Sequence, residues 1–219
     1  MPGLESAEMA KSKSITEDGT TYRFSSDWIH RLESEEHWRL YWRQQSLMRN
    51  VIQFDNRILE IGVGSGFTAD YLRSRGLKVI TVDIDEQKKP DIVANIVKFH
   101  PATTFDHILA FEVFEHIPFR QFEQVIQNLS PRCSGCFFVS LPQYRWVIAA
   151  VEFKLPRLGE RRLALTMPKS SLNTAHHHWE IGYGDIDEED VIDVFARHGF
   201  SLRDSNTGFC RTFFAFDRV

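Results

Sequence analysis

The sequence contains few cysteines, no long apolar segment and no excess of basic residues. Its three cysteines, Cys133, Cys136 and Cys210, are too few and too unevenly spaced for a disulfide framework, which indicates a reducing compartment. No run of about 18 apolar residues occurs, and the N-terminus lacks the apolar core of a signal peptide. We therefore expect a cytoplasmic protein without a membrane span. Lysine and arginine number 26 against 30 acidic residues, a net charge of −4, which argues against a nucleic acid-binding surface over the whole protein.

The composition predicts one globular unit. Of 219 residues, 42% are hydrophobic and 18 are phenylalanine, enough to build a large core, and the length favours a single domain. Residues 1–24 are mostly small, polar and charged without periodicity, so we expect a flexible N-terminal tail followed by one domain over residues 25–219.

Strand and helix patterns alternate along that domain. The first element is a helix from the N-cap Ser34 to Asn50, and we expect its buried face to include Trp38 and Trp42. Strands are expected at 57–61, 78–82, 91–94, 105–110, 136–141, from 201 and at 209–216, and helices at 67–75, 119–129 and 187–198. Strands separated by helices indicate a doubly wound, mostly parallel α/β sheet. The last two strands, joined only by residues 204–208, are expected to form an antiparallel hairpin.

One insertion interrupts the alternation between the strand ending at 141 and the helix starting near 187. Residues 142–180 are too long for an ordinary connection, which favours a substrate-binding or lid segment. Between Arg145 and Lys169 six basic residues oppose two acidic ones among many apolar side chains. This pattern favours an amphiphilic or anionic substrate, or peripheral contact with a membrane surface; the alternative is a lid with solvated charges.

A glycine-rich turn follows the strand at 57–61. Glu60 is followed by Gly62, Gly64 and Gly66, and such glycines let a ligand approach the backbone at the N-terminus of the next helix. The spacing from Gly64 also satisfies a dinucleotide fingerprint, so spacing alone does not exclude a nicotinamide enzyme. Asp83 ends the next strand, where its carboxylate can accept hydrogen bonds from two ribose hydroxyls; Asp85 is an alternative, and a turn cap is the structural explanation.

These segments together resemble the class I S-adenosylmethionine-dependent methyltransferases, in particular the small-molecule branch of ubiquinone-type O-methyltransferases. The resemblance spans about residues 36–216 and rests on LEIGVGSG, VDID, PDIVANI, FDHILAFEVFEHI, CFFVSLP and HHHWEIG. It implies a Rossmann-like seven-stranded sheet and S-adenosyl-L-methionine as the cofactor. It also implies that Glu60 anchors the turn and the methionine ammonium, that Asp83 holds the ribose, and that Asn95, where the family usually has Asp, binds the adenine amino group. The remaining cofactor contacts would be Ile84 and Ile96 beside these residues, Phe111 and Glu112 near the methionine, and Arg43 at its carboxylate, unless Arg43 is simply an exposed helix residue.

Four histidines are candidates for the catalytic base. His116 follows the strand at 105–110, while His176, His177 and His178 precede the last helix, across the same expected crevice. Methyl transfer requires alignment of the acceptor and, for a hydroxyl acceptor, removal of a proton, which suits histidine. A structural hydrogen bond is the alternative role for each. His176, His177 and His178 could in principle complete a zinc site with Cys133 and Cys136. We nevertheless expect no metal, because a second closely spaced ligand pair is missing and the two cysteines occupy a position where a turn is needed.

The favoured function is therefore methyl transfer to a small-molecule acceptor, and we expect the methyl group to go to a hydroxyl of an amphiphilic or anionic metabolite. An RNA or protein methyltransferase would share the cofactor motifs but is expected to have a broader basic face. A non-catalytic cofactor-binding module would keep the same motifs and lack a base. The oligomeric state does not follow from the sequence.

Overall fold

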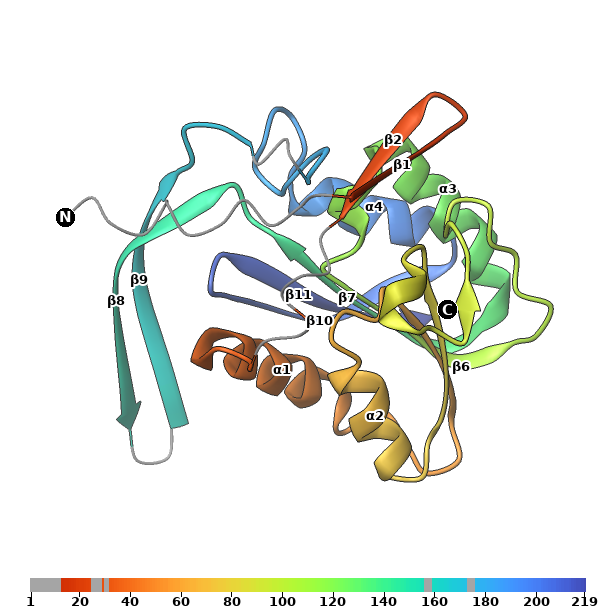
Figure 1. Cartoon of the computed structure of the whole chain (residues 1–219). Coiled ribbons are helices and arrows are strands. Elements are labelled where there is room, and N and C mark those ends of the chain that lie inside the picture. Colours follow the sequence, from red (N-terminus) through yellow and green to blue (C-terminus); the bar gives the residue numbers. More distant parts are fainter. Residues whose placement is uncertain (1–12, 25–28, 30–31, 156–158, 173–175) are drawn as a thin grey trace.

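The computed structural model of the protein describes residues 13–24, 29, 32–155, 159–172 and 176–219 (Figure 1). Its α-helices are α1 (Glu35–Met48), α2 (Phe67–Ser74), α3 (Phe119–Leu129) and α4 (Glu188–Arg197). Its strands are β1 (Lys13–Glu17), β2 (Thr20–Phe24), β3 (Arg57–Ile61), β4 (Lys78–Asp83), β5 (Ile92–Val93), β6 (Phe105–Phe111), β7 (Cys133–Pro142), β8 (Arg145–Leu155), β9 (Gly159–Pro168), β10 (Phe200–Gly208) and β11 (Arg211–Arg218). Short 3₁₀ turns lie at η2 (Glu86–Lys88), η3 (Phe114–His116) and η4 (Ser130–Arg132).

Seven strands form the central sheet in the order β10-β11-β7-β6-β3-β4-β5. All neighbouring pairs are parallel except those of β11, which runs antiparallel to both β10 and β7. The predicted Rossmann-like sheet with an antiparallel C-terminal hairpin is confirmed. The predicted hairpin loop at 204–208 is wrong: those residues belong to β10, and the turn is Phe209 and Cys210, both with positive φ. Because β10 is the edge strand, its polar side chains stay in solvent while its backbone pairs with β11.

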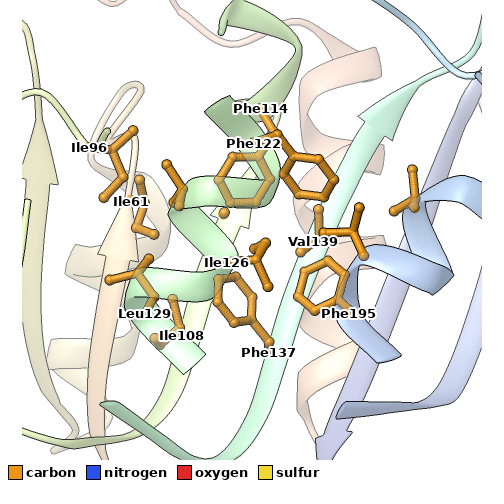
Figure 2. Packing of buried hydrophobic residues seen from close by; sticks show 14 of the residues in the cluster. Ile61, Ile96, Ile108, Phe114, Phe122, Ile126, Leu129, Phe137, Val139 and Phe195 are labelled. Carbon is orange, nitrogen blue, oxygen red and sulfur yellow. The ribbon is translucent and has the colours of Figure 1, made fainter. Parts of the chain in front are cut away.

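Helices cover both faces of the sheet. Because β7, β6, β3, β4 and β5 are parallel, their carboxyl ends lie along one edge. On one face α3 and α4 pack through a phenylalanine-rich core, in which Phe137 contacts both Phe114 and Phe195 (Figure 2). The Phe195 ring also stacks on Phe216, with ring centroids 3.9 Å apart. On the other face, α1 and α2 contribute Met48, Ala69 and Leu72 to a smaller cluster. This burial accounts for the heavy use of phenylalanine in the sequence.

Helix α1 begins where expected but buries a different face. The Ser34 side chain accepts a hydrogen bond from the His37 backbone N–H at 3.2 Å and caps the helix. The expected burial of the tryptophans is wrong, since Trp38 and Trp42 are 52% and 62% exposed. Leu40, Gln44 and Met48 are the buried residues of α1 instead. Both stripes recur at helical spacing, so the period alone did not determine which one meets the sheet.

The segment Cys133–Cys136 is the start of β7 rather than the expected turn. The turn lies one step earlier, in η4. Both thiols are buried, and that of Cys133 donates to the Cys136 carbonyl. Burial raises the pKa of Cys133 to about 12, which keeps the thiol protonated and suits a packing role.

Part of the expected N-terminal tail is ordered. Residues 1–12 lie outside the described residues, but β1 and β2 form an antiparallel hairpin. Tyr22 of this hairpin is 5% exposed and its hydroxyl donates to the Gln121 side chain of α3 at 3.0 Å. The prediction of a flexible tail up to residue 24 is therefore wrong for residues 13–24. A two-residue turn, Asp18-Gly19 with positive φ at both positions, closes the hairpin and was not recognised in the sequence.

The insertion contains a long antiparallel ribbon, β8–β9, that extends away from the sheet beside α1 (Figure 1). Trp146 pairs with Met167, Ala149 with Leu165 and Val151 with Leu163, and directly opposed residues share one face of a ribbon. A register shift between Val147 and Ala149 keeps these pairs on the same face. We call this set the apolar ribbon face; all six of its residues are exposed. None of the described helices combines the length and the apolar composition that crossing a membrane requires.

Candidate active site

A cavity of about 450 Å³ opens at the carboxyl ends of β3, β4 and β6. Most of the predicted site residues line it: Gly62, Gly64, Asp83, Ile84, Asn95, Ile96, Phe111, Glu112, His116, His176 and His177. The same cavity wall contains residues that the sequence analysis missed, notably Tyr22, Arg23 and Phe24 of the N-terminal hairpin and Lys88 of η2. A cavity of this size with a few convergent polar groups is typical of a small-molecule site.

The glycine turn forms one wall because three of its residues have left-handed backbones. Gly62, Gly64 and Gly66 have φ of +77°, +56° and +83°. A Cβ atom at Gly62 would lie 2.4 Å from a methyl group of Val113, so the close packing of the two loops also requires glycine there. Gly66 is the N-cap of α2 and lies outside the cavity lining. The turn borders the cavity through Gly62 and Gly64. The backbone N–H groups of Gly62, Val63 and Gly66 are already bonded within the protein, to the Val82 carbonyl, the Asp83 carboxylate and the Val63 carbonyl.

Asp83 is buried and held rigidly at the cavity wall. One carboxylate oxygen accepts the Val63 backbone N–H at 2.8 Å, and the other accepts that of Asp85 at 2.9 Å. The Lys88 ammonium lies 3.1 Å from the same carboxylate. The bond to Val63 links the acid to the glycine turn, which gives Asp83 a structural role in addition to the predicted ribose contact.

Asn95 connects the cavity to the N-terminal hairpin. Its side-chain oxygen accepts the Val97 backbone N–H at 3.1 Å, and its amide nitrogen donates to Glu17 of β1 at 3.0 Å. The oxygen has a second lone pair for a ligand, so the predicted contact with an amino group is compatible with this geometry.

Besides Gly66, two predicted cofactor residues lie outside the cavity lining, Glu60 and Arg43. Glu60 is 4% exposed behind the glycine turn, and its Oε2 atom has no hydrogen-bond partner among the described residues. Burial raises the pKa of Glu60 to about 8. Arg43 is directed elsewhere: it donates to the Asn206 side chain at 2.6 Å and lies over the Phe209 ring. The hypothesis that Arg43 meets a cofactor carboxylate therefore has no support from its position.

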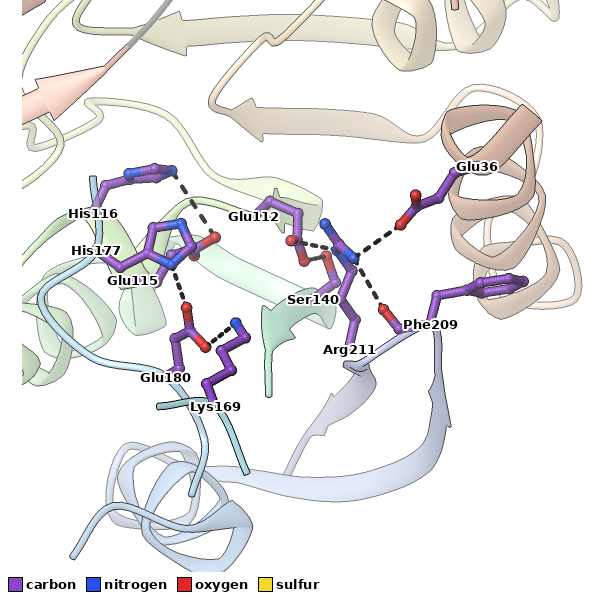
Figure 3. Close-up of polar contacts among 10 residues, drawn as sticks. All are labelled: Glu36, Glu112, Glu115, His116, Ser140, Lys169, His177, Glu180, Phe209 and Arg211. Carbon is purple, nitrogen blue, oxygen red and sulfur yellow. Dashed lines mark hydrogen bonds and ion pairs between the residues drawn. The ribbon is translucent and has the colours of Figure 1, made fainter. Parts of the chain in front are cut away.

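Glu112, at the end of β6, is held in a left-handed conformation with φ of +55°. Its carboxylate accepts hydrogen bonds from Ser140 of β7 at 2.9 Å and from Arg211 of β11 at 2.7 Å (Figure 3). Such a conformation is costly for a glutamate, and the two side-chain contacts offset that cost. The contacts orient Glu112 at the cavity wall, and neither partner was predicted.

His116 and His177 both line the cavity, and their rings pack edge to face with centroids 5.1 Å apart (Figure 3). The Nδ1 atom of His116 lies 2.9 Å from the His176 carbonyl oxygen, which can only accept, so Nδ1 carries the hydrogen and Nε2 keeps its lone pair. Burial, together with the charge of His177, lowers the pKa of His116 to about 3, so this ring is neutral at physiological pH.

His177 is oriented by a buried acid that the sequence analysis did not identify. Its Nδ1 atom lies 2.7 Å from Glu180, and Lys169 pairs with the other carboxylate oxygen of Glu180. Although burial raises the pKa of Glu180, the hydrogen bonds from His177 and Lys169 hold it below its ordinary value. Glu180 is therefore ionised, and its bond to Nδ1 leaves Nε2 of His177 as the available nitrogen.

The His176–Glu180 segment is attached to η3 by its neighbours. The Trp179 indole N–H donates to the carbonyls of Phe114 and Ile117, and the His178 backbone N–H donates to Glu115. The His178 imidazole is hydrogen-bonded to the backbone of Thr21 and does not line the cavity. Of the four predicted histidines, the structure thus brings His116, His176 and His177 together and directs His178 elsewhere.

The sequence matches the model of a family described as a methyltransferase domain over residues 20–204, most of the chain. No curated protein matches the sequence. Solved structures share the fold at low identity. Magnesium protoporphyrin IX methyltransferase from Synechocystis PCC 6803, with bound S-adenosylmethionine, is 15% identical (84% of this chain, 80% of that chain, TM-score 0.56). An S-adenosylmethionine-dependent methyltransferase from Mesorhizobium loti is 14% identical (80% and 98%, TM-score 0.56).

A third structure is the N-methyltransferase NodS from Bradyrhizobium japonicum WM9 in complex with S-adenosyl-L-homocysteine, at 16% identity (84% of this chain, 93% of that chain, TM-score 0.53). The glycine turn, the acid that ends β4 and the cavity at the sheet edge are the features expected of this fold. With the family match over most of the chain, they lead to one conclusion: the chain belongs to the methyltransferase domain family and is an S-adenosylmethionine-dependent methyltransferase.

Proposed function

We propose that the enzyme transfers a methyl group from S-adenosylmethionine to a small-molecule acceptor, at a hydroxyl group presented to His177. In this proposal Gly62 and Gly64 border the methionine, Asp83 binds the ribose and Asn95 binds the adenine. The placement of these four residues on one cavity wall supports the assignment. Glu60, behind the turn, would pair with the methionine ammonium, whose positive charge favours the ionised form of this acid, and its unpartnered oxygen supports that role.

The observation that carries the acceptor side is the pairing of His177 with Glu180. A histidine whose Nδ1 bonds a buried carboxylate presents its Nε2 atom in a fixed direction, as a proton-removing group requires. His116 lies beside it, but its low pKa makes it a much weaker base. The deprotonation of the acceptor is therefore assigned to His177, with Glu180 as its positioning residue.

The apolar ribbon face supports an amphiphilic acceptor. Six exposed apolar residues on one side of an exposed ribbon form a surface that would be costly to maintain without an apolar partner. Lys169 follows this ribbon and bonds Glu180, so the ribbon is directly connected to the His177 site. We therefore place the apolar part of the acceptor, or the lipid surface that contains it, along the ribbon.

The experiment supplies labelled S-adenosylmethionine with separate pools of polar metabolites, lipids, RNA and protein. We expect label in a small-molecule pool. The His177→Gln variant should lower turnover by about 10²–10⁴-fold while S-adenosylmethionine affinity, measured by calorimetry, changes little. His178→Gln, one residue away and outside the cavity lining, is the matched control and should retain turnover. Label only in RNA or protein would refute the acceptor class, and undiminished turnover of His177→Gln would refute the assigned role.

A further inference from the structure

We infer that Glu115, His116 and His177 form a binding site for a zinc-type divalent cation on the acceptor side of the cavity. The three side chains each contribute one ligand atom, and these atoms lie within 4.8 Å of one another. Two imidazole nitrogens and one carboxylate oxygen are the donor set of many catalytic zinc sites, which keep a fourth position for water or substrate. The expectation of no metal concerned a zinc site built on Cys133 and Cys136, whereas the present site contains neither cysteine.

The Nδ1 atoms of His116 and His177 make the hydrogen bonds that are typical of metal-binding histidines. Nδ1 of His116 donates to the His176 carbonyl at 2.9 Å, and Nδ1 of His177 is 2.7 Å from the Glu180 carboxylate. A metal-binding histidine characteristically gives its other N–H to a carbonyl or a carboxylate, because this bond fixes the ring and raises the basicity of the ligating nitrogen. Both Nε2 atoms are thereby left to bind a cation, and Figure 3 shows both rings near the Glu115 carboxylate.

Glu115 provides an independent indication of a ligand. Its side chain is only 1% exposed, and its Oε2 atom has no hydrogen-bond partner among the described residues. Its Oε1 atom lies 4.0 Å from Nε2 of His116. Ligands at tetrahedral zinc are about 3.3 Å apart, given bonds of about 2.0–2.2 Å, so small side-chain rotations would complete the site. A buried acid without a partner is costly, and a bound cation would supply the missing interaction.

The donor set selects the kind of cation. Mg²⁺ and Ca²⁺ prefer oxygen ligands, whereas two imidazoles suit Zn²⁺ and its substitute Co²⁺. The carboxylates of Glu112 and Glu180 lie nearby, and each is paired with a basic side chain, Arg211 and Lys169 respectively. The remaining coordination position would face the cavity that His116 and His177 line.

The catalytic role of the cation, unlike its binding, rests on the proposed function. A hydroxyl bound to the cation loses its proton to water more readily. The cation would then activate the acceptor hydroxyl in place of the His177 imidazole, and His177 would act as a ligand. The acceptor oxygen then forms a bond to the methyl carbon while the carbon–sulfur bond breaks. The electron pair of that bond stays on sulfur, and S-adenosylhomocysteine leaves as a neutral thioether.

The test measures metal binding separately from turnover. The purified protein, treated with a chelator and desalted, is titrated with Zn²⁺ by calorimetry and with Co²⁺ by visible absorption, which reports tetrahedral coordination. We expect one Zn²⁺ per chain, little response to Mg²⁺, and at least about 100-fold weaker Zn²⁺ binding in Glu115→Gln and His177→Gln. His178→Gln is the matched control and should bind Zn²⁺ like the wild type. His116→Gln replaces Glu115→Gln if circular dichroism shows that the latter does not fold.

The two proposals fail in different ways. Zinc binding that depends on Glu115 and His177 supports the metal site, even if no acceptor is methylated and the proposed function fails. Absence of stoichiometric binding, or binding unchanged in the folded variants, overturns the metal site. Methyl transfer that persists after chelation in a protein without zinc binding overturns it too, and leaves proton removal by His177 in place.

Discussion

Replacing Glu60 by glutamine should stabilise the ligand-free enzyme and lower its affinity for S-adenosylmethionine. Glu60 is buried at the end of β3, one carboxylate oxygen lacks a partner among the described residues, and burial raises its pKa to about 8. Glutamine has nearly the same shape and carries no ionisable group, so the substitution isolates the cost of burying the acid.

The magnitude follows from the pKa. A glutamate ionises at 4.5 in the unfolded chain and at about 8 in the folded one, and each pKa unit corresponds to about 1.4 kcal/mol. At pH 7 the folded state must bind a proton that the unfolded chain releases, which costs about 3 kcal/mol. The glutamine amide lacks a hydrogen-bond partner at the same position, which destabilises the variant by roughly 1–2 kcal/mol and reduces the gain. The net gain of about 1–2 kcal/mol corresponds to a rise in Tm of roughly 2–8 °C for a chain of this size.

The gain should depend on pH in one direction. Between pH 4.5 and 8 unfolding of the wild type releases a proton from Glu60, so its stability falls as the pH rises through this range. The variant lacks this term. We therefore expect the Tm advantage of the variant to be largest near pH 8, to shrink as the pH falls and to reverse below about pH 5–6, where the cost of the glutamine amide exceeds the remaining ionisation cost of Glu60. Calorimetric melting of the ligand-free proteins measures it. Glu189→Gln, at an exposed position in the first turn of α4, is the control for removal of a surface acid.

A Tm difference that is equal at pH 5 and pH 8, or one that grows as the pH falls, would refute this reasoning. Binding provides the second measurement. Because Glu60 is proposed to attract the methionine ammonium, the stabilised variant should bind S-adenosylmethionine about tenfold or more weakly, on the scale of a charge-assisted hydrogen bond. Unchanged affinity would remove Glu60 from the cofactor site and leave only its effect on stability.

Two further predictions concern the turn and the ribbon. Gly62→Ala should lower the free energy of unfolding by at least about 2 kcal/mol, because φ is positive there and the added Cβ would clash with Val113. Gly184→Ala, also at positive φ but with no atom within 4 Å of the added Cβ, is the control and should cost about 1 kcal/mol. Equal costs of the two variants in urea unfolding would contradict the packing argument. The double change Val151→Ser and Leu163→Ser removes two opposed residues of the apolar ribbon face and should reduce methylation of the lipid pool several-fold. The affinity for S-adenosylmethionine should stay unchanged, because the ribbon lies outside the lining of the cofactor cavity. Equal lipid labelling of the variant and the wild type would contradict the role of the apolar ribbon face.

Features that depend on short stretches of chain were predictable. The strand Arg57–Ile61, the glycines of the following turn and the helix α3 all occur at the expected residues, since each depends on local periodicity or local backbone freedom. Asp83 was predicted at the cavity because the carboxyl ends of parallel strands lie at one edge of the sheet. The antiparallel last pair followed from its short connection, although the turn itself was misplaced.

Features that depend on which segments meet in space were decided by the tertiary structure. Periodicity could not distinguish the exposed Trp38 stripe of α1 from the buried Leu40 stripe, because both repeat at helical spacing. The N-terminal hairpin gains its order from distant partners such as Gln121, 99 residues from Tyr22. The division among the histidines has the same origin: His116 meets the His176 carbonyl across 60 residues, and His177 turns to Glu180 because Trp179 anchors the segment to η3. The sequence by itself determined most elements of the central sheet, the glycine turn and the sheet edge that holds the cavity. Packing decided which side chains converge on the acceptor, because such contacts depend on the whole fold.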